Sequence, residues 1–395
     1  MAVEKAHDWI VVGGGIAGAA AAYELANQGL SVLLLESQSN LQATSRGYGG
    51  VPYWMGSTPL MRQLCEAGRT RHQVLPGELG ADTQFRELDL LLTVAANQDL
   101  NQALESYANC SQVPAPIGVP EACDREPLIN PEAIAGALLV RHGHVNPEQL
   151  VEAYVQAFTR LGGTFRLAKV TQVKDGPTPQ VFTTEGPLDC DNILVCAGGL
   201  SRHLLRVSGR SLQQYFTHAE VLITPPLPVS LRTMIMPAAS QRAVLESQAT
   251  QPQNEEQWRQ EARPIGSPIV DPGAIQFLDG RLYIGQISRA IADPFAPIDL
   301  QQSEATLRQR IGALLPALEA IPGVCHHCLV AFSSDGLPLV GPVAEASHIQ
   351  VFSGFAGPFA IVPPLAQRFA AHVTGHPDAI ITALSPRRVS LTAEG

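Results

Sequence analysis

The start of the chain alternates between continuous apolar runs and a segment of small residues. The apolar run at 9–12 predicts a short strand buried on both faces of a parallel sheet. The segment 16–27 is rich in alanine, the strongest helix former, and predicts a helix. A second apolar run at 31–35 predicts another strand, so the pattern is typical of a strand–helix–strand unit.

Glycines occupy the turn between the first predicted strand and the helix, with the spacing G-x-G-x-x-G. Gly13 permits a tight turn, Gly15 lets a pyrophosphate approach the main chain, and Gly18 lets the helix pack closely on the strand. Glu36 ends the second strand, where a carboxylate can accept hydrogen bonds from ribose hydroxyls. This context favours a dinucleotide site over a glycine turn without a ligand, but the motif alone does not separate NAD from FAD.

The rest of the chain continues to mix helical and strand patterns without an internal repeat. Asn146 can cap a helix whose first turn holds Pro147 and which stops at the glycines 162–163. The polar stretch 238–272 predicts a long insertion, which is a lid, a subunit contact or a solvated surface excursion. Further helices are predicted at 59–75, 100–108 and 303–315, and further strands at 85–94, 164–167, 170–174, 181–184, 191–199, 219–224, 274–285 and 349–353.

Composition narrows the class of protein. The chain has 395 residues, of which 45% are hydrophobic, enough for two domains or one large composite with a full core. The net charge of −10 argues against nucleic acid and against an anionic membrane surface as partners. No continuous apolar run is long enough for a spanning helix, and the N-terminus lacks the pattern of a signal peptide. We therefore expect reduced cysteines and a cytoplasmic protein, with peripheral membrane contact left open.

The segment Cys325-His326-His327-Cys328 raises the question of a metal site. The surrounding residues predict a strand, in which alternation places Cys325 and His327 on one face and His326 and Cys328 on the other. Four side chains arranged in this way cannot converge on one tetrahedral ion, so we expect no metal.

The order of motifs along nearly the whole chain resembles the D-amino-acid oxidase family of FAD-dependent oxidoreductases, which includes glycine oxidase, sarcosine oxidase and D-arginine dehydrogenase. After the glycine turn, the segments that carry the resemblance are "ATSRGYGG" at 43–50, "GHVNPEQLVEAYVQAFTRLGG" at 143–163, "ILVCAGG" at 193–199, "DGRLYIGQ" at 279–286, "SSDGLPLVGP" at 333–342 and "LSPRRV" at 384–389. This late return to nucleotide-domain motifs disfavours a simple NAD(P)-dependent enzyme and favours FAD.

The resemblance implies an α/β (α+β) fold, with a Rossmann-like FAD-binding domain and a second, substrate domain built on a mixed β-sheet. The FAD-binding domain would comprise residues 1–90, 140–215 and 325–395, and the substrate domain 91–139 and 216–324. The residues implied to bind FAD are Gly13, Gly15, Ile16, Ala17, Gly18, Glu36, Ser37, Thr44, Ser45, Arg46, Val170, Ala197, Gly198, Cys328, Gly354, Phe355, Ala356 and Gly357.

The chemistry that the resemblance implies is oxidation of a C–N bond in an amine or amino acid. The α C–H of the neutral amine delivers a hydride to the flavin N5 atom, and the product imine hydrolyses afterwards. The candidate catalytic residues are Tyr53, which would form an aromatic wall with Tyr48 and Trp54, and the polar residues Gln276 and His218. The alternative is a flavin-binding scaffold protein without catalysis.

Two departures from the family pattern concern the carboxylate of an amino-acid substrate. Val330 stands where members carry a carboxylate-binding arginine, and residues 354–361 hold no basic side chain. The substrate is therefore expected to be larger, less acidic, or held by other residues. The candidate replacements are Arg46, His218, Arg232 and Arg289, of which Arg46 is also a candidate FAD contact.

Two further departures concern electron transfer and the flavin itself. Tyr283 occupies the position of an oxygen-activating lysine in sarcosine oxidase, so we expect a dehydrogenase that passes electrons to a quinone or another acceptor rather than to oxygen. Cys328 has the spacing of the sarcosine oxidase cysteine that is bonded to the flavin. A covalent tether through Cys328 is thus the alternative to the non-covalent binding that we expect.

Overall fold

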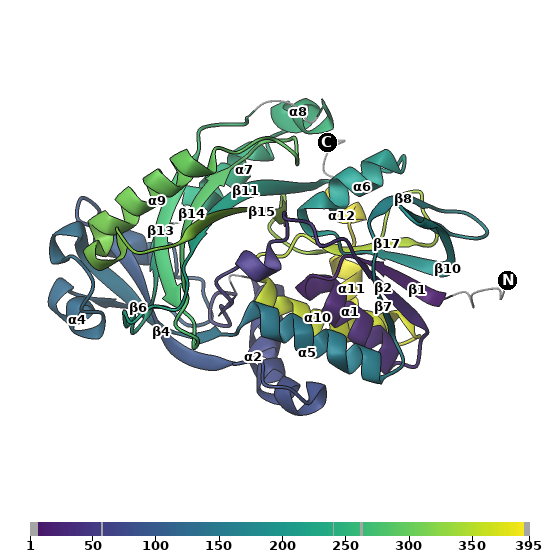
Figure 1. The fold of residues 1–395 in the computed structure, drawn as a ribbon, viewed down its shortest axis with the longest axis horizontal. Helices are drawn as coiled ribbons and strands as arrows, with labels where there is room; N and C mark the ends of the chain where they lie inside the picture. The colour runs from purple at the N-terminus through teal and green to yellow at the C-terminus, as the bar shows by residue number, and fades with distance from the viewer. Residues whose placement is uncertain (1–6, 57, 240, 261–263, 391–395) are drawn as a thin grey trace.

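Two mixed β-sheets lie side by side, and helices cover their free faces (Figure 1). The computed structural model describes residues 7–56, 58–239, 241–260 and 264–390. Residues 1–6, 57, 240, 261–263 and 391–395 lie outside the described residues. They include parts of the predicted FAD-binding domain and of the predicted insertion.

The first sheet contains the predicted strand–helix–strand unit. Its strands are β1 (His7–Val12), β2 (Val32–Glu36), β7 (Thr164–Leu167), β8 (Val170–Lys174), β9 (Gln180–Thr183), β10 (Gly186–Val195), β16 (Leu339–Pro342) and β17 (Ile349–Ser353). They run in the order β16-β17-β10-β1-β2-β7, and β9 joins β8 to β10. The central pairs are parallel. Ile10 and Leu33 face one core and Val11 and Leu34 the other, which explains the continuous apolar runs.

The second sheet is mostly antiparallel. Its strands are β3 (Gly50–Val51), β4 (Arg86–Ala95), β5 (Ala115–Ile117), β6 (Ile134–His144), β11 (Gln214–Ile223), β12 (Met234–Pro237), β13 (Ile269–Gln276), β14 (Leu282–Arg289) and β15 (Val324–Ser333). The order is β15-β11-β14-β13-β12-β4-β6-β3, with β5 attached to β6. Among the described strand pairs of this second sheet, only β12–β4 is parallel. With the helices on the first sheet, this arrangement confirms the predicted fold class.

Helices separate the strands and cover both sheets. They are α1 (Ile16–Asn27), α2 (Pro59–Leu79), α3 (Leu100–Glu105), α4 (Val119–Arg125), α5 (Pro147–Arg160), α6 (Ser201–Val207), α7 (Gln241–Ala249), α8 (Glu255–Gln260), α9 (Leu300–Leu314), α10 (Pro358–Val373), α11 (Ala379–Ala383) and α12 (Arg387–Ser390). The predicted cap of α5 is confirmed, because the Asn146 side chain accepts hydrogen bonds from the N–H groups of Glu148 and Gln149. Within the described residues, no helix is long and apolar enough to cross a membrane.

The two faces of the second sheet have different neighbours. Leu90 and Val140 belong to the hydrophobic cluster that also contains α1 and α10, and we call this side the inner face. Leu91 and Ala137 belong to the cluster that contains Leu307 of α9, and we call that side the outer face (Figure 1). Residues of opposite parity on β4 and β6 therefore point to opposite faces.

The predicted domain boundaries stay a prediction, but each falls inside a strand of the second sheet. The divisions at 90/91, 139/140, 215/216 and 324/325 cut through β4, β6, β11 and β15, respectively. Residues 325–333, assigned by sequence to the FAD-binding domain, instead continue the ladder between β15 and β11. Each of these strands is hydrogen-bonded into one sheet along its length. If the domains were divided according to the two sheets, β4, β6, β11 and β15 would therefore belong entirely to the domain of the second sheet.

The polar stretch 238–272 is more than a solvated excursion. It contains α7 and α8, which place Leu245, Ala249 and Trp258 in a small core with Phe216 and Phe332 of the second sheet. Burial of these side chains anchors the stretch to the ends of β11 and β15. The stretch is therefore a cover on the sheet, and a role as a lid or subunit contact stays a prediction.

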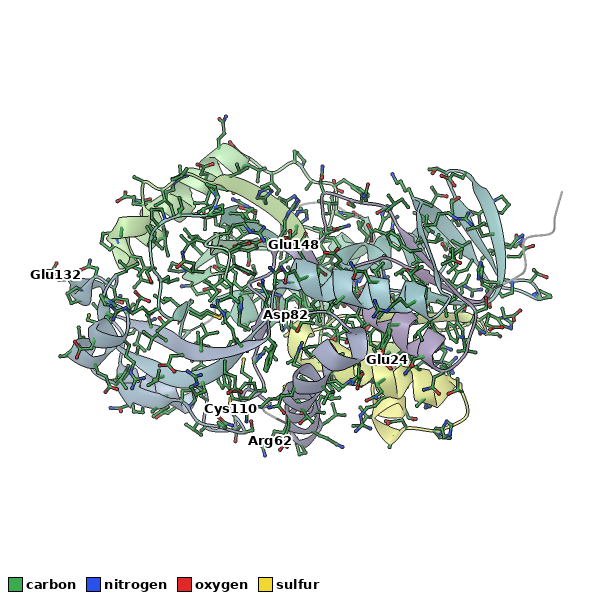
Figure 2. All side chains as sticks on the ribbon, turned by 60° about the horizontal axis from the view of Figure 1, so that its bottom comes forward. Glu24, Arg62, Asp82, Cys110, Glu132 and Glu148 are labelled. Carbon is green, nitrogen blue, oxygen red and sulfur yellow. The ribbon has the colours of Figure 1, made fainter. Side chains whose placement is uncertain are left out.

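A buried ion pair holds α1 against α2. Figure 2 shows Glu24 on α1, close to α10. Its carboxylate accepts a hydrogen bond from Arg71 of α2 at 2.8 Å, and only 1% and 7% of the two residues are exposed. Burial outweighs the charge of Arg71 and raises the pKa of Glu24. The pair therefore matters chiefly because the Glu24 carboxylate would be stranded in the core without Arg71, whereas Arg71 also pairs with Glu78 at 2.7 Å.

Substituting Arg71→Met should lower the free energy of unfolding by about 3–5 kcal/mol at neutral pH, because Glu24 is left unpaired. A carboxyl whose pKa is raised in the folded state takes up its proton more readily when folded than when unfolded. The stability lost in the variant should therefore be partly recovered as the pH falls toward that raised pKa. Urea unfolding at neutral and mildly acidic pH measures both effects.

The matched control is Arg141→Met, which breaks an exposed pair with Asp89. We expect a cost below about 1 kcal/mol for it. Equal costs for the two variants would contradict the assigned role of the buried pair.

Candidate functional site

The glycine turn leaves no room for side chains. Gly13 has a φ of +107°, and a Cβ atom there would lie 2.5 Å from the main-chain oxygen of Cys196. A Cβ atom on Gly18 would lie 1.7 Å from the oxygen of Gly13. Gly15 has no side chain to cap α1. Apart from Ile16, whose N–H donates to the Thr44 hydroxyl, the first N–H groups of the helix and the positive end of its dipole face outward from the turn. The turn can therefore hold a diphosphate.

Glu36 is fixed beside this turn. One carboxylate oxygen accepts a hydrogen bond from the N–H of Gly14 at 2.5 Å, and the other accepts from Gln38 and Gln42. The main-chain oxygen of Glu36 accepts from Ala168 at 2.8 Å, which brings the predicted contact Val170 to the same edge of the sheet. The Glu36 carboxylate, which is the predicted hydrogen-bond acceptor for a ribose, thus lies next to the glycine turn.

Two further strand ends, and the start of α10, meet the turn. Cys196, after β10, donates to the oxygen of Val12 at 2.8 Å and so places Ala197 and Gly198 beside Gly13. The oxygen of Gly198 also lies 3.5 Å from the hydroxyl of Ser353, the last residue of β17. The predicted contacts Gly354, Phe355, Ala356 and Gly357 follow directly, and Gly357 is the uncapped N-terminus of α10. The carboxyl ends of the parallel strands therefore form one continuous edge, the usual ligand-binding edge of such sheets.

The segment 44–50, here called the connecting loop, links this edge to the inner face of the second sheet. The Thr44 hydroxyl accepts a hydrogen bond from the first N–H of α1 at 3.2 Å. The oxygen of Ser45 accepts from the hydroxyl of Tyr283 on β14 at 3.1 Å. The hydroxyl of Tyr48 lies 3.0 and 2.9 Å from main-chain oxygens of β13 and β14. A ligand lying along this loop would contact both sheets.

The four predicted carboxylate-binding residues do not form one group of free donors, although His218 and Arg289 lie directly opposite each other on β11 and β14. Arg289 pairs with Glu220, whose side chain is fully buried, at 2.9 Å. Arg232 is exposed. Arg46 lies in the connecting loop and donates to main-chain oxygens at 3.1 and 3.3 Å. The fourth residue, His218, lies on the face of β11 that Glu220 shares, and Glu220 bonds to Ser303 of α9.

His218 is enclosed by protein partners. Its Nδ1 atom lies 2.8 Å from Nε2 of His327, and its own Nε2 atom lies 3.0 Å from the oxygen of Asp293. The rings of His218 and His327 stack with centroids 4.9 Å apart. Burial lowers the pKa of each ring to about 4. The structure therefore uses His218 to join β11, β15 and a loop, and its partner His327 accepts a hydrogen bond from Arg46 of the connecting loop through its main-chain oxygen.

The other two candidate catalytic residues also have structural partners. The Gln276 side chain accepts from the N–H of Leu231 at 2.9 Å and donates to the oxygen of Val229 at 2.7 Å, so it fixes the loop before β12. Tyr53 is buried under the guanidinium of Arg69, 4.7 Å from the ring centroid. Tyr53, Gln276 and His218 thus do not form one cluster.

The Cys325–Cys328 segment lies in β15. Cys325 packs in the outer cluster, and Cys328 is buried opposite Ala219 of β11. Burial raises the pKa of the Cys328 thiol to about 12. In the part of the chain that the structure describes, no three His, Cys, Asp or Glu side chains are grouped closely enough to hold a metal ion.

The sequence reasoning missed a polar group on the inner face. Arg86 of β4 and His142 and His144 of β6 lie beside the connecting loop, because β3, at the end of that loop, pairs with β6. No strand was predicted over β6. The apolar run "IAGALLV" at 134–140 is the signal that could have revealed it, although periodicity alone does not separate a buried strand from a buried helix in such a run.

A separate cavity of about 670 Å³ lies at the opposite edge of the first sheet. Asp8 and Asp191, just before the central parts of β1 and β10, line it. Since the glycine turn follows the other ends of these strands, this cavity does not belong to the candidate site.

Curated relatives are similar to parts of this chain. An opine oxidase subunit of Rhizobium meliloti is 23% identical over 234 residues, 55% of this chain and 63% of the relative. Glycerol 3-phosphate oxidase of Mycoplasma pneumoniae is 28% identical over 158 residues, 36% of this chain and 40% of the relative. The chain matches less than two thirds of the length of each of these relatives.

Among solved structures, glycine oxidase from Geobacillus kaustophilus is similar over 96% of this chain and 98% of its own, with a TM-score of 0.76 and 20% identity. At this identity the likeness shows the fold alone. A family profile described as "FAD dependent oxidoreductase" (DAO) matches residues 8–371. Because that match runs from β1 into α10, the chain belongs to the DAO family of FAD-dependent oxidoreductases, as the order of its motifs predicts.

Proposed function

We propose that this protein uses FAD to oxidise a C–N bond of a small amine or amino acid. The observation that carries the proposal is the connecting loop, which joins a dinucleotide-binding edge to the inner face of a second sheet. The names of two similar proteins, an opine oxidase and a glycine oxidase, support a nitrogen-containing substrate. Fold alone would leave the reaction open, so the proposal depends on tests at the site itself.

The residues present fit FAD. Gly13 and Gly18 have no space for a side chain, and the uncapped start of α1 offers its N–H groups to the diphosphate. Glu36 is held at the end of β2, where the ribose of the adenosine half would bind. The predicted contacts Thr44, Ser45 and Arg46 continue this path toward the second sheet, where the flavin half would lie. These assignments are proposals that follow from the strand ends meeting at one edge.

The protein's part in the reaction is to position groups and exclude water. When bound, FAD accepts the hydride from the α carbon of the substrate. The uncapped N-terminus of α10 offers N–H groups to negative charge that develops on the ring system. On the opposite side, Phe277 and Tyr283 are buried with ring centroids 4.5 Å apart and form an apolar wall. The site needs no charged general base if the amine enters neutral.

Electron transfer is proposed to go to a quinone or another acceptor rather than to oxygen. Burial raises the pKa of Tyr283 to about 12, so the phenol is neutral at neutral pH. It contacts the connecting loop through Ser45 but offers no positive charge to a developing superoxide. A catalytically silent scaffold remains the second candidate, because Tyr53, Gln276 and His218 are dispersed in the structure.

Anaerobic titration of the holoprotein with a library of amines and amino acids tests the proposal. We expect at least one compound to bleach the visible flavin absorbance, because hydride transfer reduces the ring. Glycerol 3-phosphate belongs in the library as the C–O comparison. Oxygen uptake, recorded with the same compound, should be slow, whereas an added artificial quinone should be reduced quickly.

A library in which no compound bleaches the flavin would favour the scaffold. Bleaching by hydroxy compounds alone would replace C–N with C–O oxidation. Fast oxygen uptake without a quinone would contradict the dehydrogenase proposal while leaving C–N oxidation intact.

Substituting Gly15→Val should give a folded but colourless protein, because the side chain would occupy the space of the pyrophosphate. The only close neighbour of a Cβ atom there is the Thr44 side chain, at 2.9 Å for its hydroxyl, so the fold itself should tolerate the change. Flavin content per chain is read from the visible absorbance. Gly77→Ala, at an exposed helix position with open space around it, is the control and should keep its flavin. Full flavin in Gly15→Val would refute the assignment.

Acid precipitation should release the flavin into a yellow supernatant and leave a white pellet. Forming a tether requires a thiolate, and the buried Cys328 thiol, with a pKa of about 12, is protonated at neutral pH. Cys328→Ser should accordingly retain its flavin. A yellow pellet with the mass of FAD on the Cys328 peptide would overturn this expectation.

A further inference from the structure

Three polar side chains stand among apolar residues on the inner face of the second sheet. Arg86 of β4 lies directly opposite His144 of β6, and His142 lies two residues before His144. On the same face and ladder, Leu90 and Val140 belong to the inner hydrophobic cluster. Directly paired residues of an antiparallel sheet share a face, so Arg86, His142 and His144 point to the inner side.

The proton position on His142 follows from its partner. Its Nδ1 atom lies 3.0 Å from Nε1 of Trp54, and an indole nitrogen can only donate. Nδ1 therefore accepts, and the proton of the neutral ring is on Nε2. Burial lowers the pKa of His142 to about 3, so the ring is neutral at neutral pH. Nε2 is buried, the residue is 3% exposed, and this N–H has no partner among the described residues.

His144 is arranged in the same way. Its Nδ1 atom lies 3.4 Å from Nε of Arg86, which can only donate. The proton is therefore again on Nε2, whose nearest acceptor is the main chain of Tyr48, in a poorly aligned contact, and the residue is only 2% exposed. Burial, and then the charge of Arg86, lowers the pKa of His144 to about 3, and the main chain of Tyr48 opposes this only weakly. The strand thus presents two neutral N–H donors on one face.

Arg86 brings a positive charge without a compensating carboxylate. Within the described residues it makes no ion pair, and its Nη2 atom donates to the main-chain oxygen of Gln276. Burial alone lowers its pKa, with no acidic group acting in the other direction. An unpaired guanidinium in a partly buried position is unfavourable unless an anion joins it. The other arginine candidates, Arg46 and Arg289, are bonded elsewhere.

These donors adjoin the site proposed for the flavin. A Cβ atom on Gly50, in β3, would lie 2.7 Å from Nε2 of His142, so only a residue without a side chain leaves the space beside that nitrogen unfilled. The ring of His144 meets Phe277 edge-on at 4.9 Å, and Phe277 packs on Tyr283. The donors and the apolar wall therefore line the same side of the connecting loop.

We propose that Arg86, His142 and His144 bind a carboxylate group of the substrate, a role that rests on the proposed function. One guanidinium and two neutral N–H donors match a single negative charge with several acceptor positions. A phosphate ester would place up to two charges against one cation. The neutral rings also avoid repelling the substrate's amine. The group would thus replace the arginine that is missing at Val330.

Binding of simple anions to the holoprotein tests this proposal without requiring turnover. Acetate is titrated by calorimetry and by the change in the flavin spectrum, acetamide serves as the uncharged analogue, and inorganic phosphate as the competing anion. We expect acetate to bind at least about tenfold more tightly than either of the other two.

Variants locate the binding. His142→Asn and His144→Asn keep an acceptor near the Nδ1 position for Trp54 and Arg86 but remove the Nε2 donor, and Arg86→Met removes the charge. Each should weaken acetate binding by about tenfold or more. His376→Asn, at an exposed histidine, is the control and should bind acetate like the wild type.

The outcomes separate this proposal from the proposed function. Acetate binding that depends on these residues supports the subsite even if no amine reduces the flavin. Amine oxidation by a protein whose acetate binding survives all three substitutions would refute the subsite alone. Equal binding of acetate and acetamide, or tighter binding of phosphate, would also refute it. If Arg86→Met does not fold, the two asparagine variants and the acetamide comparison still decide.

Discussion

The glycine turn brings main chain against main chain with no side chain between. A Cβ atom on Gly18 would lie 1.7 Å from the oxygen of Gly13, and one on Gly13 would lie 2.5 Å from the oxygen of Cys196. This contact sets the distance of α1 from β1 and of β1 from the end of β10. The uncapped helix end, the carboxylate of Glu36 and the loop after Ser353 can meet at one edge only because these three elements approach so closely.

The connecting loop runs from that edge to the second sheet, and it is bonded to both. Its two anchors are hydroxyls of Tyr48 and Tyr283, and both bond to main-chain oxygens rather than to side chains. The Tyr48 anchor depends only on the main chain of β13 and β14, whereas the second anchor requires a tyrosine at position 283. The inner face beside the loop carries Arg86, His142 and His144, the group proposed to take the place of an arginine at Val330.

The sequence predicted well what depends on neighbours in the chain. The strand–helix–strand unit, the Asn146 cap and the order of family motifs are local patterns, and the structure or the family match confirms them. It predicted poorly what depends on strand pairing. The direction of the His218 and Gln276 side chains depends on the ladder in which each strand lies, and β11 has a shift of register between Glu220 and Val221. The β6 strand escaped prediction because its pairing with β4 and β3, rather than its composition, defines it.

The central position of β10 has a consequence for synthesis. It pairs with β1, near the beginning of the chain, and with β17, which begins only at Ile349. Until the ribosome has released β17, one edge of β10 has unpaired main-chain groups beside apolar side chains. Such an edge invites pairing with other chains. The nascent protein therefore passes through an interval in which the unpaired edge of β10 is open to aggregation, and the interval ends only when β17 joins the sheet.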